Sequence, residues 1–256
     1  VMIVFGMESL LTKYFLAALA PVRPIQLVVL PAPPSYVTTS FYRANPLMIT
    51  PSSVAELAAS MHIPVLYLVR WQDIHTHLPV DAKIVVCCFP RKFPDWICAR
   101  GCYNVHPSLL PMLRGPDPLF YTARGDAPAC ITIHRMDSGY DTGPIVVQQL
   151  VDDRECHDEA SYISAHATLA AQLCGNDDIF TLPLRPQSDV VASYAPIPQH
   201  SAYVLPSSWP AQRIRRFIQF TDLRQMSYWV PDLQCWVDSL ADAIRVGVPC
   251  FDEKLT

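Results

Sequence analysis

The sequence predicts an α/β protein built on a doubly wound, mainly parallel sheet with a short C-terminal appendage. Short apolar runs rich in β-branched residues alternate along the chain with segments of helical spacing. The runs at 64–69 and 83–89 are apolar apart from Lys83, which is typical of strands that are covered on both faces. Strand and helix in alternation indicate βαβ units, and such units form a mainly parallel, twisted sheet.

The first half of the chain holds most of the predicted strands. These strands are expected at 2–5, 25–31, 64–69, 83–89 and near 101–104. Apolar residues at helical spacing predict a helix at 10–19, and Ser53 with Glu56 predicts a capping box in front of another. Glu8 and Lys13 interrupt the apolar N-terminus and a basic leader is missing, so a strand and a helix are expected there rather than a signal peptide.

The second half continues the alternation and then loses it. Helices are expected at 116–124 and 158–174, and strands at 129–136 and 144–151. Residues 181–207 are rich in Pro and Ser, which is typical of a linker, and a helix with Ile214, Phe217 and Ile218 turned inward is expected at 208–220. The chain is therefore expected to consist of a main domain at 1–180, a linker at 181–207 and a small C-terminal module at 208–256.

Composition excludes several classes of protein. The apolar fraction of 51% and the charged fraction of 16% provide a core and argue against disorder. A net charge of −4 without a long basic run argues against a broad nucleic-acid surface, and no run is long enough for a membrane span. The 9 cysteines include no CxxC pair, and His75 and His77 have no third ligand nearby, so we expect no zinc site and a reducing, cytoplasmic compartment.

Polar side chains follow the strand near 101–104. Asn104 and His106 lie at its end, and the loop at 136–144, between two strand-like runs, carries Asp137 and Asp141 in what we expect to be an equivalent place. Ligands of open parallel sheets bind beyond the carboxyl ends of the strands, so these groups are expected to converge on one pocket. Asp can orient a His and favour its charged form, and Asn donates a hydrogen bond. Such a set suits a reaction that builds negative charge on a carbonyl oxygen and moves one proton.

Two of the polar residues have a structural alternative. Asp137 can close an Asx turn within its loop, and His134, in the predicted strand before it, lines the pocket edge or has a structural role.

The glycine-rich phosphate loop of dinucleotide-binding domains is missing, because FGMESLL has one Gly where GxGxxG needs three. The sheet alone therefore does not indicate an NAD enzyme.

Two stretches of the sequence resemble the formyltransferases that use 10-formyltetrahydrofolate: NVHPSLLPMLRGPDPLFYTARGD and ITIHRMDSGYDTGPIVVQ. The family pattern is Asn-x-His, then Ser-Leu-Leu-Pro, an Arg-Gly step and an Asp-Thr-Gly. Every part is present, with Asp141 35 positions after His106. The likeness covers 1–175, and 208–220 is similar to the segment where tRNA-formylating members enter a second domain. In outline the chain is most similar to methionyl-tRNA formyltransferase-like proteins.

The resemblance implies a catalytic trio, Asn104, His106 and Asp141, and 10-formyltetrahydrofolate as the formyl donor, with no metal. An acceptor amine would attack the formyl carbon, and a charged His106 and the Asn104 amide would stabilise the oxyanion. The resemblance also implies a pocket for the pterin ring of the donor. Its residues would be Phe89, Pro90, Arg91, Lys92, Phe93, Asp137, Ser138, Gly139 and Tyr140.

The acceptor stays open at this point. A methionyl-tRNA is one possibility, and an amino sugar or another small amine is the alternative. Hydrolysis of the donor and a catalytically silent folate-binding relative are two further readings. Phosphate backbones are bound through several Lys or Arg contacts, whereas the loop at 32–47 has only Arg43. The local basic cluster of Arg213, Arg215 and Arg216 either contacts an anionic acceptor or forms a solvated helix face.

Overall fold

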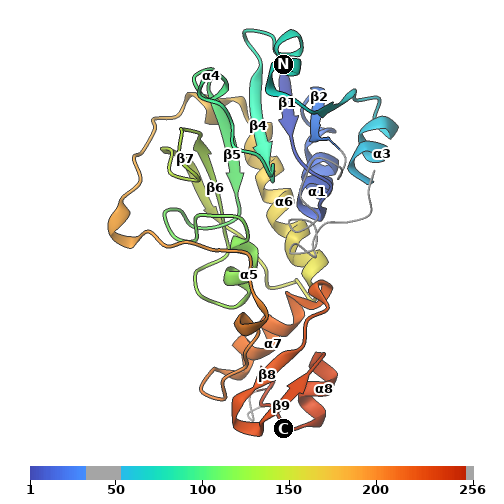
Figure 1. Cartoon of the computed structure of the whole chain (residues 1–256), viewed down its shortest axis with the longest axis vertical. Helices are drawn as coiled ribbons and strands as arrows, with labels where there is room; N and C mark the ends of the chain where they lie inside the picture. Colours follow the sequence, from blue (N-terminus) through green and yellow to red (C-terminus); the bar gives the residue numbers. More distant parts are fainter. Residues whose placement is uncertain (33–52, 252–256) are drawn as a thin grey trace.

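A seven-stranded sheet dominates the computed structural model, which describes residues 1–32 and 53–251. Its spatial order is β3-β2-β1-β4-β5-β6-β7 (Figure 1). The strands are β1 (Met2–Phe5), β2 (Ile25–Pro31), β3 (Val65–Leu68), β4 (Lys83–Cys87), β5 (Cys102–His106), β6 (Cys130–Arg135) and β7 (Ile145–Leu150). The first five are parallel, and β6 is antiparallel to both of its neighbours. The predicted mainly parallel sheet is confirmed.

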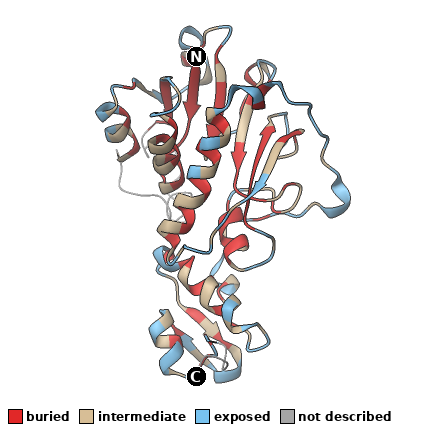
Figure 2. Cartoon of the chain, turned by 180° about the vertical axis from the view of Figure 1, so that it is seen from behind, coloured by how far each residue is buried: buried red, intermediate tan, exposed pale blue. Residues whose placement is uncertain are grey.

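Helices cover both faces of the sheet, which explains why its central strands β1 and β4 are largely apolar. On one face, Met2 and Val4 pack with residues of α1 (Leu10–Leu19) and α6 (Glu159–Gly175). On the other, Ile3 and Phe5 pack with α4 (Asp95–Cys98) and the 3-10 helix η1 (Trp71–His77). Figure 2 shows the strands buried between these layers. No helix in the described ranges is both long and apolar enough to cross a bilayer.

The N-termini of two helices are capped by side chains close to the end of β1. Ser9 caps α1 by accepting from the Thr12 amide. In α3 (Ser53–Ser60), the amides of Val54 and Ala55 donate to the Glu8 carboxylate at 2.7 and 3.4 Å. Among the described residues the Ser53 hydroxyl has no hydrogen-bond partner, so the predicted Ser53–Glu56 capping box is wrong. An acidic group from another loop satisfies the helix instead, as the helix dipole favours.

The Pro- and Ser-rich passage runs along the edge of the sheet in extended form (orange in Figure 1). Arg185 exchanges two backbone hydrogen bonds with Ile145 of β7, and Ser193 and Ala195 bond to the backbone of Arg114. We call residues 185–195 the strap. The strap therefore bridges the edge strand and the loop that follows β5. Whether 181–207 separates two domains stays a prediction.

The elements of the C-terminal module surround an apolar core that they share with Phe120. These elements are α7 (Ala211–Gln219), β8 (Tyr228–Val230), β9 (Cys235–Val237) and α8 (Leu240–Arg245). Ile214, Phe217 and Ile218 are buried, as the helical spacing predicted. Phe120 of α5 (Pro118–Ala123) is part of the same core, so the module is packed onto the main domain.

A buried ion cluster also joins the module to the main domain. Arg224 contacts Asp117 at 2.6 Å and Glu159 at 2.9 Å, and all three side chains are almost inaccessible. Of the basic cluster, Arg213 pairs with Asp126 and Arg216 with Asp153. Two of the three guanidinium groups thus contact acidic groups of the main domain. The 32–47 loop, weighed for acceptor binding, lies outside the described residues apart from Ala32.

Candidate active site

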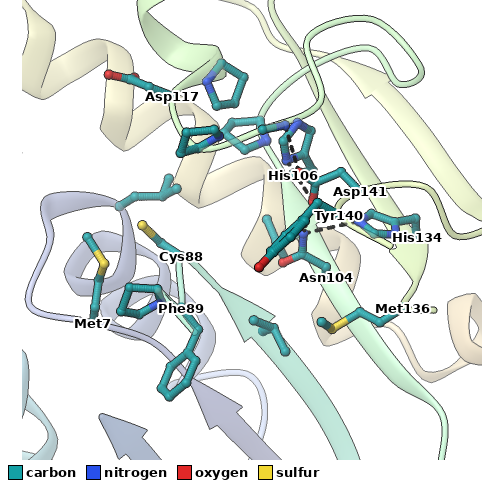
Figure 3. A pocket seen from close by; sticks show the side chains of 18 of the residues that line it. Met7, Cys88, Phe89, Asn104, His106, Asp117, His134, Met136, Tyr140 and Asp141 are labelled. Atoms are coloured by element: carbon teal, nitrogen blue, oxygen red, sulfur yellow. Dashed lines mark hydrogen bonds and ion pairs between the residues drawn. The ribbon is translucent and has the colours of Figure 1, made fainter. Parts of the chain in front are cut away.

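A cavity of about 290 Å³ opens at the carboxyl ends of β1, β4 and β5. Met7 and Ser9 line it from the segment after β1, and the residues from Cys88 to Phe93 line it from the segment after β4. Asn104 and His106 of β5 form part of its wall (Figure 3). The cavity therefore lies where ligands of open parallel sheets bind.

Asn104, His106 and Asp141 come together at this cavity. The two β5 residues are two positions apart, so their side chains lie on the same face of the sheet. The Asp141 Oδ1 is 3.0 Å from the Asn104 Nδ2 and 3.5 Å from the His106 Nδ1 (Figure 3). The structure thus brings the three predicted residues into one polar cluster.

The route by which Asp141 reaches the cluster differs from the expected one. Because β6 is antiparallel to β5, its last residue, Arg135, pairs with Tyr103 at the beginning of β5. The loop at 136–144 therefore starts at the opposite end from His106, and the expected equivalence of the strand ends is wrong. The loop folds back towards β5, and Asp141 has a φ of 56° at this return.

His106 is an almost fully buried imidazole whose Nε2 lies 2.8 Å from the Leu113 carbonyl oxygen. A carbonyl only accepts, so Nε2 carries a hydrogen and the other ring nitrogen is free in the neutral form. Burial lowers the pKa of His106, and this outweighs Asp141 and the Leu113 carbonyl, which raise it. Burial therefore favours the neutral imidazole in the free protein, with the Nδ1 lone pair towards Asp141, whereas the charged His106 that the resemblance implies stays a prediction.

Asp141 is ionised despite its burial. Burial raises the pKa of its carboxyl, but His106, His134 and the Gly115 amide outweigh burial and hold the pKa well below its usual range. The carboxylate accepts from the Asn104 Nδ2 and, at 2.9 Å, from the Gly115 amide. A fixed negative charge thus lies beside an unprotonated imidazole nitrogen.

The Asn104 amide is oriented by two partners. Its Nδ2 lies 3.0 Å from the Asp141 carboxylate and 3.1 Å from the His134 Nε2. If the Asn104 amide were flipped, its oxygen would face the Asp141 carboxylate oxygen with no hydrogen between them. The amino group must therefore face Asp141. The side-chain oxygen of Asn104 takes part in none of the hydrogen bonds among the described residues, which leaves it as an acceptor at the cavity wall.

His134 is a site residue that the sequence interpretation weighed too lightly. It is the direct cross-strand partner of Asn104, lines the cavity and lies 3.6 Å from the Asp141 carboxylate. Its Nε2 accepts from Asn104, so the neutral ring carries its hydrogen on Nδ1. The pairing of β5 with β6 would have revealed it, but the apolar pattern of a strand does not name the neighbouring strand.

Most of the predicted donor-pocket residues line the cavity. These are Phe89, Pro90, Arg91, Lys92, Phe93, Asp137, Gly139 and Tyr140. Ser138 is exposed and is not part of the lining, so its part in binding the donor stays a prediction. Asp137 accepts from the Gly139 amide and the Thr142 hydroxyl, which is the Asx turn considered as its alternative.

Several lining residues were not expected from the sequence. Gly115 donates its amide to Asp141, and Tyr194 of the strap also lines the cavity although the residue is largely exposed. A Pro- and Ser-rich passage has no periodicity that would indicate such a contact.

His75 stacks on Trp96 with ring centroids 4.0 Å apart. In the described ranges no three His, Cys, Asp or Glu side chains are grouped to hold a metal ion.

Comparison with known proteins points to a single family. Residues 84–172 match the family model described as formyl transferase. A methionyl-tRNA formyltransferase of Brucella anthropi is 32% identical over 188 residues, which cover 68% of this chain and 60% of that protein. The chain thus spans less than two thirds of the length of this relative.

Solved structures share the fold at low identity. A 4-N formyltransferase from Francisella tularensis has a TM-score of 0.57 at 16% identity, over 92% of this chain and 95% of that one. An N-formyltransferase from Helicobacter canadensis, in complex with folinic acid and dTDP-3-aminofucose, has a TM-score of 0.55 at 16% identity, over 86% and 79%.

Proposed function

Because the chain belongs to the formyl transferase family, we propose that it transfers a formyl group from 10-formyltetrahydrofolate to the amine of an acceptor. The observation that carries this proposal is the cluster at the cavity wall. An ionised Asp141 lies 3.5 Å from the Nδ1 of a neutral His106, and the Asn104 oxygen is free beside them. This set can accept a proton, stabilise the resulting charge and orient an amine.

The cavity suits the flat heterocycle of a folate. Met7, Val86 and Met136 provide apolar surface, and the backbone from Cys88 to Phe93 offers polar groups along one wall. Such a combination of apolar lining and few directed polar groups is typical of small-molecule sites. Tyr140, exposed at the mouth, supplies an aromatic face on the other side. When bound, 10-formyltetrahydrofolate supplies an activated formyl carbon.

The residues divide the work of the transfer between them. The Asn104 oxygen accepts an N–H of the acceptor amine and so directs the nitrogen lone pair at the formyl carbon. As the new C–N bond forms, the His106 Nδ1 takes the amine proton. His106 then gives this proton to N10 of the folate as the bond between N10 and the formyl carbon breaks. Positioned acid–base groups of this kind contribute roughly a hundredfold or more to rate.

The Asp141 carboxylate stabilises the positive charge that His106 carries during the reaction. A protonated imidazole would be costly in this buried place, and a carboxylate at 3.5 Å offsets that cost. His106 is thus a base in the free protein and a cation only while the reaction proceeds. In this order, a protonated His106 would be available to stabilise the negative charge that develops on the formyl oxygen.

For the acceptor we favour a methionyl-tRNA, by likeness to the relative that is 32% identical. An amino sugar or another small amine is the second candidate, because Arg213 and Arg216 are already paired with Asp126 and Asp153. A polyanion needs several cationic contacts, whereas a small amine does not.

One assay separates these possibilities. The protein is incubated with 10-formyltetrahydrofolate alone, with methionyl-tRNA or with nucleotide-linked amino sugars, and tetrahydrofolate release is followed. Release that depends on an acceptor supports the transferase, and the effective acceptor names the substrate. Release without any acceptor identifies a hydrolase, and donor binding without release identifies a silent relative. With tRNA, activity should fall steeply as salt is raised, whereas a small amine should show little dependence.

A further inference from the structure

We propose that Gln187, in the strap, is a positioning residue that holds the Asp141 carboxylate in place against His106. The proposal rests on the proposed function, because it assigns Gln187 a role in that reaction. Gln187 does not line the cavity in the described structure and acts through its neighbours. It lies 46 positions after Asp141 in the sequence, in the passage expected to be a linker.

The Gln187 side chain makes four hydrogen bonds to two separate loops. Its Nε2 donates to the backbone carbonyls of Asp141 at 2.8 Å and Gly143 at 2.7 Å. Its Oε1 accepts from the Nε of Arg114 at 3.0 Å and from the Nη2 at 2.9 Å. Two donors and two acceptor positions are all that a carboxamide offers, so the group is fully used. No charged side chain can replace it, because both roles are needed at once.

These two loops determine where the Asp141 carboxylate lies. One carries Asp141 itself, and the other presents the Gly115 amide, which donates to the carboxylate at 2.9 Å. Gln187 bonds to the backbone carbonyl of the first and to the side chain of Arg114, next to Gly115. Gln187 therefore links Asp141 to the loop whose Gly115 amide donates to the Asp141 carboxylate.

The loop that carries Asp141 needs such support. Asp141 has a φ of 56°, in the left-handed region that most residues with a side chain avoid, although Asn and Asp enter it more often than others. The outer part of the loop, from Asp137 to Tyr140, is exposed and is organised by its own Asx turn. The contacts of Gln187 fall on the inner part, at Asp141 and Gly143. Without them, the left-handed turn would be free to relax and move the carboxylate.

Two substitutions at this position separate positioning from simple anchoring of the strap. Gln187→Ala removes all four hydrogen bonds. Gln187→Glu keeps an acceptor, now charged, for Arg114 but has no hydrogen for the two carbonyls. Positioning predicts that both variants lose roughly tenfold to a hundredfold in kcat, the size of effect seen when catalytic groups are misplaced. Anchoring alone predicts that Gln187→Glu is as active as wild type, which would overturn the proposal.

A control and a second readout complete the test. Val190→Ala lies in the same strap at a side chain that is 93% exposed, and its kcat should equal that of wild type. The second readout is the titration of His106 by NMR in the protein without folate. The titratable groups that face His106 are Asp141, which raises its pKa, and His134, which lowers it. Displacement of the carboxylate in Gln187→Ala should therefore move the His106 titration to lower pH.

Asp141→Asn removes the negative charge of the carboxylate entirely and therefore provides the reference midpoint for the His106 titration. A Gln187→Ala titration that moves from the wild-type midpoint towards the Asp141→Asn midpoint supports positioning. An unchanged midpoint, with Asp141→Asn shifted, overturns it. Because the titration needs no donor or acceptor, it tests Gln187 separately from the activity. A shifted midpoint in a protein that transfers no formyl group would overturn the proposed function and support only the positioning of Asp141 by Gln187.

Discussion

The His106 Nδ1 and the Asp141 Oδ1 lie 3.5 Å apart, yet burial favours the neutral imidazole in the free protein. Burial of the ring lowers its pKa more than the neighbouring carboxylate raises it. His106 can therefore accept a proton, and the Asp141 carboxylate that stabilises the resulting positive charge already lies beside it. An ion pair at rest would have no free lone pair to offer an attacking amine.

This charge state predicts the acid side of the pH–rate profile. The value of kcat should rise with pH as His106 loses its proton, with a midpoint below the ordinary histidine value of 6.5. Donor binding excludes more water and lowers the pKa further, in the same direction. In Asp141→Asn the remaining activity should have its midpoint at still lower pH, because the charge that raises the pKa of His106 is gone. A wild-type midpoint above 6.5 would contradict a neutral His106.

Gly115 should not tolerate a side chain. Its φ is +114°, and an added Cβ would lie 2.6 Å from the Tyr194 ring and 2.9 Å from the Ala195 carbonyl oxygen. Gly115→Ala should therefore displace the strap, weaken the amide contact to Asp141 and lower kcat. Gly101→Ala is the matched control, since φ is +87° there but nothing lies within 4 Å of the added atom. Urea unfolding should show a loss of about 1–2 kcal/mol for the control and more for Gly115→Ala. Equal losses and equal kcat in the two variants would argue against the contact with the strap.

Removal of Arg224 should be among the most destabilising single changes. Arg224→Met leaves Asp117 and Glu159 buried without their cation, which typically costs about 3–5 kcal/mol. The free energy of unfolding in urea measures the loss. As a control, Arg245→Met breaks an exposed pair with Asp242 and should leave stability unchanged within error. A loss for Arg224→Met as small as that of the control would show that the buried cluster does not hold the module to the main domain.

A second buried histidine predicts loss of stability in acid. Burial lowers the pKa of His166 to about 4, and its Nε2 has no hydrogen-bond partner among the described residues. The unfolded chain, with an ordinary value near 6.5, binds the proton first, so stability should be complete above that pH and fall towards pH 4. The contribution is on the order of 3 kcal/mol.

Substitution of His166 isolates this contribution. His166→Gln should reduce the slope of unfolding free energy against pH between about 6.5 and 4, and the exposed His157→Gln should leave it unchanged. Thermal or urea unfolding at several pH values measures the slope. An equal slope in wild type and His166→Gln would exclude His166 as its source.

The fold could be predicted from the sequence because its strands are covered on both faces. Residues 2–5 are apolar without interruption, 25–31 are apolar except for Gln26, and the observed β1 and β2 have the same bounds. The direction of β6 could not be predicted, since a strand has the same apolar pattern whichever way it runs. His134 was therefore not recognised as the neighbour of Asn104. The charge state of His106 could not be predicted from the sequence either, because it depends on the balance between burial of the ring and a carboxylate 35 positions away.

The strap shows a different limit of sequence interpretation. Gln187 and Tyr194 lie in a passage without periodicity, and what they do depends on loops far away in the chain. Gln187 contacts Arg114, 73 positions earlier, and Asp141, 46 positions earlier. Local sequence gives no sign of such contacts, whereas the Asn-x-His pattern is local and could be recognised.

Transfer of an isotope-labelled formyl group from 10-formyltetrahydrofolate to an acceptor amine tests whether the cluster at the cavity is the catalytic centre. The wild-type protein should move the label onto the amine. His106→Ala should do so at least about a hundredfold more slowly, with the exposed His157→Ala as the matched control at the wild-type rate. Transfer by His106→Ala at a near-normal rate would contradict the role given to His106.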